Sequence, residues 1–517
     1  MSVATNQAAS IGVFRGTGDQ RMVGSRGALL FGVAVIALSA CAIGSFIGGS
    51  VGLALTSAAT LATTWVVLQV GNTILPNSYC FKAVVCIYGS QCLVQLLLAL
   101  YGTTTCINGA WGMDIAEHSG ALALGHLSLL GGTALAAVVY GSVIRRKNSD
   151  SLDLTQSLPK RAQYALVAAL LVHVLQPMLG QLLPETLAWM LSVLGEDLEA
   201  VAFFVGWFAG DLGAVANGGV LVVLVLNVLV GGLRGTRYPI MLLGLYLVGR
   251  LISPRERRRA AVICTALAAA FPILVFFSMV GDVRSTRGLG SVELLKPSHW
   301  SDFFEGATVS QSDYDTQRAD PIGNVLYRLY AWPNAASIIL TPDPVPYRGF
   351  AGWAASWGAY FRFGTWSPEA REEYYQSGYG TNQSSHYGFL NQPGSAVEFG
   401  VIADGWSTAG PLGVLIMGFL AMLALCLGEE LGLYSKKLSY TSKLIFLCIL
   451  LKACIQCYVY PTPLVIRYVA LYTCFWLVLL KTIDALRMRQ QYPFGRQTPA
   501  MAPGFAVRRE FKSGYDR

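Results

Sequence analysis

The sequence predicts an all-α polytopic membrane protein with about 12 transmembrane helices and one large, partly helical extracytoplasmic loop. Two observations carry this prediction. Of the 517 residues, 54% are hydrophobic and 13% are charged, whereas a soluble chain has roughly a quarter of its residues charged. Apolar runs of about 20 residues, the length that a helix needs to cross a bilayer, also recur along most of the chain.

Twelve windows meet this length criterion. They lie near residues 28–48, 51–71, 82–101, 119–142, 162–182, 198–214, 217–233, 238–253, 260–280, 409–427, 444–460 and 463–482. The first window follows three arginines and is succeeded at once by a second window. We therefore expect it to be a retained anchor rather than a cleaved signal peptide.

The charges of the connecting loops test this count independently, because cytoplasmic loops are rich in Lys and Arg. With the N-terminus inside, the even-numbered spans must end beside basic residues. Four of them do so, at residues 145–147, 255–259, 436–443 and 487–489. The loop after the third span carries Asp114 and Glu117 but neither Lys nor Arg. The region 183–253 is the weakest, and ten or eleven spans remain alternatives.

These boundaries divide the chain into four parts. They are an N-terminal membrane domain of about nine spans (1–280), an extracytoplasmic loop domain (281–407), C-terminal membrane helices (408–482) and a cytoplasmic basic tail (483–517). Long ordered loops between helices are usually functional rather than connective. Within the loop domain, the spacing of apolar residues predicts a short helix in 321–340 that Pro333 kinks.

Composition excludes several classes of function. The net charge of +8 comes from basic residues beside apolar runs, which is a topology signal and not a nucleic-acid-binding patch. The chain has no glycine-rich phosphate loop followed by Lys-Ser/Thr, no DxD-type site in the cytoplasmic loops and no tight His/Cys cluster, so we expect no cofactor and no metal. Cys454 and Cys457 form a CxxC within a predicted helix that has no second pair, and we interpret them as packing residues.

Arginine dominates the cationic residues of the loop domain. Seven arginines (Arg284, Arg287, Arg318, Arg328, Arg348, Arg362 and Arg371) stand against the single Lys296. The planar guanidinium binds phosphate or carboxylate through two parallel hydrogen bonds, which suits a diphosphate ligand. Pairing with the loop's thirteen acidic residues or with lipid headgroups is the alternative. Arg318, Arg348 and Arg362 stand out because each lies near Gly, Pro or aromatic residues.

Two further sets of side chains are candidates for binding. The loop's aromatic rings, Tyr347 and Trp366 among them, suit stacking on sugars or an interfacial belt. Lys452 lies on one face of the eleventh span, and Arg467 lies about one turn into the twelfth. Ionisable residues inside a membrane are costly and usually functional. Snorkelling to the interface is the alternative for Arg467.

Four segments carry a resemblance to a known family. They are Gln-Arg-Ala-Asp at 317–320, Pro-Tyr-Arg-Gly at 346–349, Tyr-Phe-Arg-Phe-Gly-Thr-Trp-Ser-Pro at 360–368, and Ser-Ala-Val-Glu-Phe-Gly at 395–400 followed by Gly-Pro-Leu-Gly at 410–413. In order and in position before the last three helices, this run resembles the Wzy-type O-antigen and exopolysaccharide repeat-unit polymerases. It covers about a fifth of the chain.

The resemblance implies a GT-C-like, metal-independent membrane glycosyltransferase in the bacterial inner membrane, with its active face periplasmic or extracellular. Such an enzyme transfers a glycan chain from polyprenyl diphosphate to a sugar hydroxyl of another lipid-linked unit. The implied partners are the polyprenyl-diphosphate-linked oligosaccharide, membrane lipids, a chain-length regulator and a flippase, with no nucleic acid. An O-antigen ligase and a flippase or transporter for lipid-linked oligosaccharides are the alternatives.

The resemblance and the charge chemistry together assign roles to residues. Neutralising the charge of the departing diphosphate falls to arginine, and the acceptor hydroxyl needs a base. The catalytic candidates are Glu398, Arg318 and Arg362; the diphosphate- and substrate-binding candidates are Arg348, Tyr347, Trp366, His386, Asp320, Lys452 and Arg467. Glu398 is the first candidate for the base, and His386 and Asp404 follow it.

Overall fold

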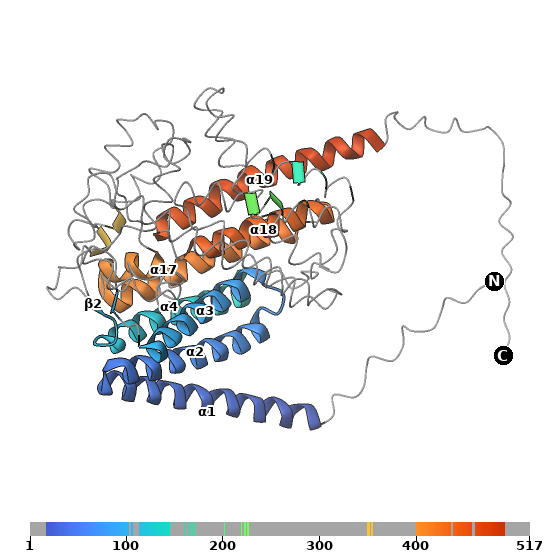
Figure 1. The fold of residues 1–517 in the computed structure, drawn as a ribbon. Coiled ribbons are helices and arrows are strands. Elements are labelled where there is room, and N and C mark those ends of the chain that lie inside the picture. The colour runs from blue at the N-terminus through green and yellow to red at the C-terminus, as the bar shows by residue number, and fades with distance from the viewer. Residues whose placement is uncertain are drawn as a thin grey trace, which may run out of the picture.

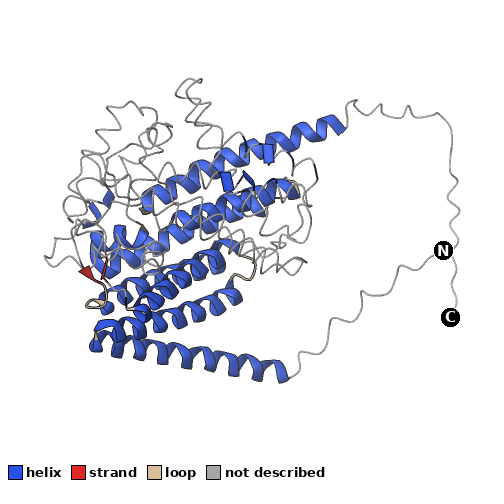
Figure 2. Cartoon of the chain, viewed as in Figure 1, coloured by secondary structure: helices blue, strands red, loops and turns tan. Residues whose placement is uncertain are grey.

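The computed structural model describes residues 17–102, 105–106, 113–144, 400–435, 438–457 and 461–491, together with single positions in 160–226 and 349–354. Apart from those single positions, the predicted spans five to nine and the loop domain up to residue 399 lie outside these residues. Figure 1 shows the described helices as a stack of roughly parallel rods, with α1 on one flank and α19 on the other. Figure 2 shows how completely helix dominates this part of the chain.

The described chain is helical apart from one two-residue pairing, β1 (Thr105–Cys106) with β2 (Met113–Asp114). Its helices are α1 (Thr17–Ile47), α2 (Gly49–Ile74), α3 (Tyr79–Tyr101), α4 (Ser119–Val139) with a π-helical extension (Tyr140–Ile144), α17 (Val401–Leu433), α18 (Tyr440–Gln456) and α19 (Thr462–Gln491). Six of them, all but α18, contain stretches long and apolar enough to cross a membrane. The chain is therefore a helical membrane protein. The total of twelve spans stays a prediction.

Helix α17 contains a break that the hydropathy pattern does not anticipate. Ala409 and Gly410 have non-helical backbone angles, and Gly410 has a φ of 61°, which a glycine adopts without strain. A short arm, residues 401–408, therefore precedes a long arm, residues 411–433. Pro411 opens the long arm at a position where the missing N–H costs nothing. The long arm matches the predicted tenth span, whereas the short arm falls inside the predicted loop domain.

Glycine allows the two arms to touch and the helices to approach closely. A Cβ atom on Gly405 of the short arm would collide with Val414 of the long arm. Between α4 and α17, a Cβ atom on Gly132 would collide with the Leu415 carbonyl, and one on Gly418 would lie 2.8 Å from a Leu129 methyl. Membrane helices associate through such small residues because lipid provides no hydrophobic drive between them.

One helix is left largely outside this packing. The α1 side chains Phe31, Ile36 and Phe46 are 72%, 70% and 93% exposed. In water such a face would be a liability, but the bilayer solvates apolar side chains. Helix α1 is thus the lipid-facing edge of the described bundle, which agrees with its place at one flank in Figure 1.

The helix ends fall into two sets at opposite ends of the bundle. The C-terminal end of α17 lies beside the start of α3 and the end of α4, through Glu429 to Tyr79 and Glu430 to Tyr140. The N-terminal end of α17 lies beside the end of α18, where the Val401 amide donates to the Cys457 carbonyl at 3.1 Å. The predicted topology makes the first set cytoplasmic and the second extracytoplasmic. We call them the inner end and the outer end.

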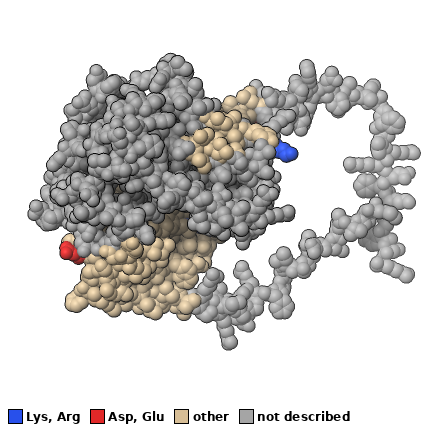
Figure 3. All heavy atoms as spheres, viewed as in Figure 1, with Lys and Arg blue, Asp and Glu red and all other residues tan. Residues whose placement is uncertain are grey.

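Charge on the described surface follows the same division. On the face drawn in Figure 3 the visible described residues are almost uncharged, with acidic atoms at one extreme and basic atoms at the opposite one. The acidic extreme is the side on which Figure 1 places β2, which belongs to the predicted outer loop after α3. The orientation of these ends in the membrane stays a prediction of the positive-inside rule.

Candidate functional site

Three helix ends meet at the outer end of the bundle and build a polar centre there. We define the outer junction as Asp404, Lys452, Gln456, Thr462, Tyr468 and Trp353. Asp404 comes from the short arm, Lys452 and Gln456 from α18, Thr462 and Tyr468 from α19, and Trp353 from the predicted loop domain. The junction therefore joins the loop to the last three described helices.

Local sequence explains why α19 begins where it does. Pro461 and Pro463 flank Thr462, and proline is favoured at the first turn because its fixed φ matches the helix. The Pro461 carbonyl accepts hydrogen bonds from the amides of Leu464 and Val465, at 3.0 and 3.1 Å. The amide of Thr462 is left without an acceptor within its own helix, as the first amides of every helix are.

Asp404 supplies that acceptor. Its Oδ2 atom accepts the Thr462 amide at 3.0 Å and the Trp353 indole N–H at 3.3 Å. Asp404 is only 1% exposed, so both bonds form out of water. A single carboxylate oxygen thus fixes α19 and one residue of the loop against the short arm.

Lys452 lies one helical turn before Gln456 on α18 and is 3% exposed. Its Nζ atom is 5.7 Å from the centroid of the Tyr468 ring on α19, a distance at which the ring face attracts a cation. A buried ammonium inside a membrane bundle is costly, and it usually marks a functional place. Among the described residues, the junction therefore contains the buried side chains of one lysine and one aspartate.

Two other polar atoms of the junction have no hydrogen-bond partner. They are the hydroxyl oxygen of Thr462, a residue that is 0% exposed, and the buried amide oxygen Oε1 of Gln456. Most buried polar side-chain atoms in proteins are paired, so an exception needs a physical reason. Ser57, Asn72, Ser119 and Thr133 of the described helices each have such an atom as well.

The structure describes two of the predicted site residues, Lys452 and Arg467. Lys452 belongs to the junction, and Arg467 is half-buried on α19, next to Tyr468 in sequence. The other candidates (Arg318, Asp320, Tyr347, Arg348, Arg362, Trp366, His386 and Glu398) lie outside the described residues. Their roles stay predictions. Asp404, the third candidate for the base, is described, and it serves as an acceptor for backbone and indole N–H groups.

A second buried carboxylate, which the sequence analysis missed, lies at the inner end. Glu429 of α17 is 2% exposed and accepts three hydrogen bonds from the start of α3. The donors are the Ser78 hydroxyl at 2.6 Å and the amides of Tyr79 and Cys80 at 2.7 and 3.3 Å. A carboxylate at a helix N-terminus is stabilised by the helix dipole as well as by these donors. Because these three donors all belong to the protein itself, we assign Glu429 a structural role.

A third polar group lies within the N-terminal helices. His126 of α4 is 2% exposed, and its Nε2 and Nδ1 atoms lie 3.1 Å from Gln95 Oε1 and 3.5 Å from Cys92 Sγ. One neutral tautomer satisfies both contacts, because Nε2–H then donates to Gln95 and Nδ1 accepts from the thiol. This group is satisfied internally.

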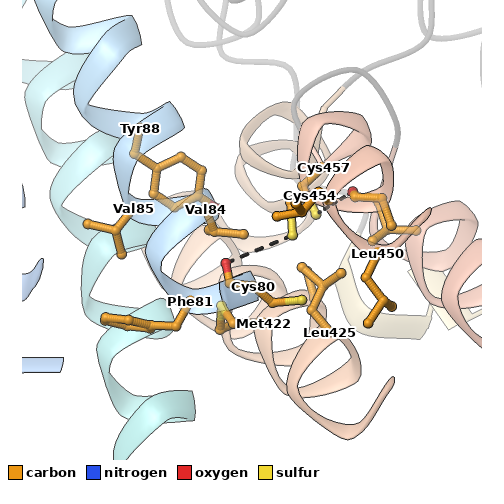
Figure 4. Close-up of a cluster of buried hydrophobic side chains, with 14 of the residues drawn as sticks. Cys80, Phe81, Val84, Val85, Tyr88, Met422, Leu425, Leu450, Cys454 and Cys457 are labelled. Carbon is orange, nitrogen blue, oxygen red and sulfur yellow. Dashed lines mark hydrogen bonds between the residues drawn. The ribbon is translucent and has the colours of Figure 1, made fainter. Parts of the chain in front are cut away.

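The CxxC cysteines lie in the apolar core between α3, α17 and α18, as Figure 4 shows. Both thiols are free and buried. Cys454 Sγ donates to the Cys80 carbonyl at 3.8 Å, and Cys457 Sγ donates to the Ala453 carbonyl at 3.4 Å. These contacts support the packing interpretation. Among the described residues, no group of three His, Cys, Asp or Glu side chains is placed to hold a metal ion.

No protein-family model, no curated protein and no solved structure matches this chain. The family resemblance therefore rests on the four sequence segments alone. What the structure adds is the geometry of the outer junction.

Proposed function

We propose that this chain is a metal-independent glycosyltransferase of the bacterial inner membrane that polymerises lipid-linked oligosaccharide repeat units. One observation carries the proposal beyond the sequence resemblance. Trp353 of the predicted loop domain donates to Asp404 at 3.3 Å, at the same outer junction where the buried ammonium of Lys452 lies. A polar centre shared by the loop and the last helices is what an enzyme acting on a membrane-borne substrate needs.

The proposed reaction needs no external energy source, because a glycosyl diphosphate is already activated. A hydroxyl of the acceptor unit attacks the anomeric carbon of the donor glycan. The bond from that carbon to the diphosphate oxygen breaks, and the diphosphate leaves with the bonding electron pair. The hydroxyl proton passes to a carboxylate or imidazole, for which Glu398 is the first candidate and His386 the second.

Charge on the leaving group determines which residues matter most. Arg318, Arg348 and Arg362 are proposed to bind the diphosphate and stabilise its developing charge. Lys452 and Arg467 are weaker partners, and Asp320 orients Arg318. The two hydrogen bonds that Asp404 Oδ2 accepts support a positioning role for this residue rather than that of the base.

The glycans of a strain that lacks the gene test this proposal. If the chain is a polymerase, the deletion strain should contain capped single repeat units in place of polymer. Long polymer left unligated to its final acceptor would instead identify a ligase, and lipid-linked units accumulating on the cytoplasmic side would identify a flippase. Normal polymer in the deletion strain would contradict all three functions.

Complementation of that strain tests the outer junction. We expect Lys452→Met to restore the protein to the membrane but not the polymer, since it keeps the side-chain length and removes the charge. Lys82→Met is the matched control. Lys82 lies at the inner end, where its ammonium donates to the Pro76 carbonyl, and this variant should restore full polymer.

A further inference from the structure

We infer that the short arm of α17 is a re-entrant helix, which occupies the outer half of the membrane and completes the crossing that α18 begins from the inner side. Helix α18 and the short arm then form one transmembrane column in two pieces, with the break between them inside the membrane. This geometry is independent of the proposed function, and only the class of substrate given below rests on it.

The short arm folds back along the long arm. A Cβ atom on Gly405 would collide with the backbone of Val414, and one on Gly413 would collide with the Gly405 carbonyl oxygen. These glycines face each other across the turn at residues 409–410, so the two arms are antiparallel. At about 1.5 Å per residue, the short arm places Val401 about 12 Å below the start of the long arm.

The neighbours of Gly428 give a second measure of this depth. A Cβ atom on Gly428 would lie 3.1 Å from a Val469 methyl of α19 and 3.2 Å from a Leu450 methyl of α18, so the three residues lie at one level. From that level α18 continues outward for about 10 Å and α19 begins about 10 Å away, whereas the long arm continues for about 25 Å to Pro411. The end of α18 and the start of α19 therefore lie about 15 Å below the start of the long arm.

This depth corresponds to the middle of a spanning helix. Both measures place the meeting point near about residues 419–421 of the long arm. A Cβ atom on Gly132 of α4 would collide with the Leu415 carbonyl and lie 2.9 Å from the Phe419 amide nitrogen. Gly132 lies at the centre of the candidate span Ser119–Val143. The ends that meet at the outer junction thus lie inside the bundle.

Hydrogen bonds join the helix ends at the break. The Val401 amide donates to the Cys457 carbonyl at 3.1 Å, so the first amide of the short arm satisfies a carbonyl at the end of α18. Both pieces run outward, and the positive end of one helix dipole therefore meets the negative end of the other. Asp404 accepts the Thr462 amide of α19 at 3.0 Å. Backbone groups inside a membrane need such partners because water does not reach them.

Burial of the turn before α19 agrees with this depth. Pro461, Thr462 and Pro463 are all buried, whereas Pro76, in the turn between α2 and α3, is exposed. Helix α18 is also too short to be counted among the candidate spans of the described chain. A helix of 17 residues that stops inside the bundle has no need of the full length.

Under the proposed function, the re-entrant helix determines which substrates the loop domain meets. Trp353 of the loop donates to Asp404 on this helix at 3.3 Å, so the loop is tied to an arm that lies within the bundle. Water-soluble glycans stay out of the apolar part of a bilayer, because burying their hydroxyls there is costly. A substrate that the loop meets along this arm is therefore one that a lipid carries.

Disulfide cross-linking of the full-length protein in membranes tests the depth. After oxidation with copper phenanthroline, Gly428→Cys with Val469→Cys should give a linked peptide pair in mass spectrometry. If the predicted spans 409–427 and 463–482 instead began at the same outer surface, Gly428 would lie level with Thr482. The matched pair Gly428→Cys with Thr482→Cys should therefore give no link.

A single substitution tests the contact between the two pieces. Val401→Cys should form a disulfide with the native Cys457, whose thiol is free. Adding Gly405→Ala should abolish this link, because its Cβ atom collides with the long arm. Gly131→Ala is the matched control, since its Cβ atom has its nearest neighbour at 3.9 Å, and it should retain the link.

Links from residue 428 to 469 and from 401 to 457, the second lost with Gly405→Ala, support the re-entrant helix. The inference is overturned if either link fails to form, if residue 428 links to 482 instead, or if the 401–457 link survives Gly405→Ala. The depth pair leaves Gly405 intact, so it stays informative even where Gly405→Ala prevents folding. Cross-links report positions within the protein whether or not it makes polymer, and the glycans of the deletion strain test the proposed function separately.

Discussion

The carboxylate of Asp404 accepts the backbone amide of Thr462 at 3.0 Å, so a side chain of α17 completes the first turn of α19. Glu429, near the other end of α17, does the same for α3, with Oε1 2.7 Å from the amide of Tyr79. Each end of α17 therefore holds the start of another helix. The two bonds bring together parts of the chain that are far apart in sequence.

Replacing Asp404 should destabilise the outer end. Asp404→Ala leaves the Thr462 amide and the Trp353 indole without acceptors, and we expect it to cost about 2–3 kcal/mol of unfolding free energy. Asp404→Asn keeps one acceptor oxygen and should cost less, about 1 kcal/mol. Thermal unfolding of the purified protein measures both. Trp353→Phe, which removes only one of the two bonds, is the control; an Asp404→Ala protein with the wild-type Tm would contradict the assigned contacts.

Replacing Glu429 should destabilise the inner end more strongly. Glu429→Ala removes the acceptor of three hydrogen bonds in a site that is 2% exposed. We expect a loss of about 3 kcal/mol or more, because bonds to a charged acceptor are the strongest. Denaturant titration in detergent measures it. Its neighbour Glu430 accepts the Tyr140 phenol at 2.6 Å at the partly buried surface of the described bundle, so Glu430→Gln should have a smaller effect. Equal effects of the two variants would argue against the cap.

Adjacent glycines of α4 should respond oppositely to alanine. A Cβ atom on Gly132 would collide with the Leu415 carbonyl of α17, whereas one on Gly131 has its nearest neighbour, a Leu415 methyl, at 3.9 Å. Overpacking of this kind costs about 1–3 kcal/mol, and an exposed helical Gly→Ala gains up to about 1 kcal/mol. Gly132→Ala should therefore lower the Tm, and Gly131→Ala should leave it unchanged or raise it. The reverse order would show that α4 and α17 do not pack as described.

The arginine assignment of the loop makes a prediction about activity. Arg318→Lys or Arg362→Lys should abolish polymer while the protein still inserts into the membrane, because lysine cannot form the two parallel bonds to phosphate. Gel electrophoresis of the glycan and the membrane content of the protein are the two measurements. Arg284→Lys, in the part of the loop without an assigned role, is the control. Unchanged polymer length in both variants would remove these residues from the site.

The two ends of the bundle should differ in access from outside the cell. Glu117, next to the start of α4, and Pro76, next to the start of α3, are both exposed and lie at opposite ends. In intact cells, a membrane-impermeant maleimide should label Glu117→Cys but not Pro76→Cys, with the wild-type protein as background. Permeabilised cells should show labelling of both. Labelling of Pro76→Cys alone in intact cells would invert the topology.

Hydropathy located the described spans well because lipid and the interior of the bundle are both apolar, so a spanning helix is apolar on every side. The predicted windows 28–48, 51–71 and 119–142 correspond to candidate spans Gly27–Ile47, Gly49–Ile74 and Ser119–Val143. The eleventh window overlaps α18, but α18 has 17 residues and is not among the six candidate spans. The chain also leaves α4 at the inner end and enters α17 at the outer end. The five crossings predicted between them lie outside the described residues and stay a prediction.

Hydropathy could not predict the short arm of α17. Residues 401–408 are polar for a membrane helix because they are buried against protein and not against lipid, and Asp404 and Ser407 are 1% and 2% exposed. Glu429 was missed for a related reason. Its partner Ser78 lies 351 residues away in sequence, and no local pattern encodes such a pair. Lys452 was found because an ionisable residue inside an apolar window is conspicuous without any knowledge of its neighbours.

The cap that Glu429 places on α3 has a consequence for biosynthesis. The ribosome makes Tyr79 350 residues before it makes Glu429, which is a delay of roughly 20–70 s at 5–20 residues per second. Throughout that interval the first amides of α3 must be satisfied by Ser78, by water or by lipid headgroups. During this interval the nascent N-terminal helices lack the carboxylate of Glu429 that caps α3. A chain truncated before α17 would never form these hydrogen bonds.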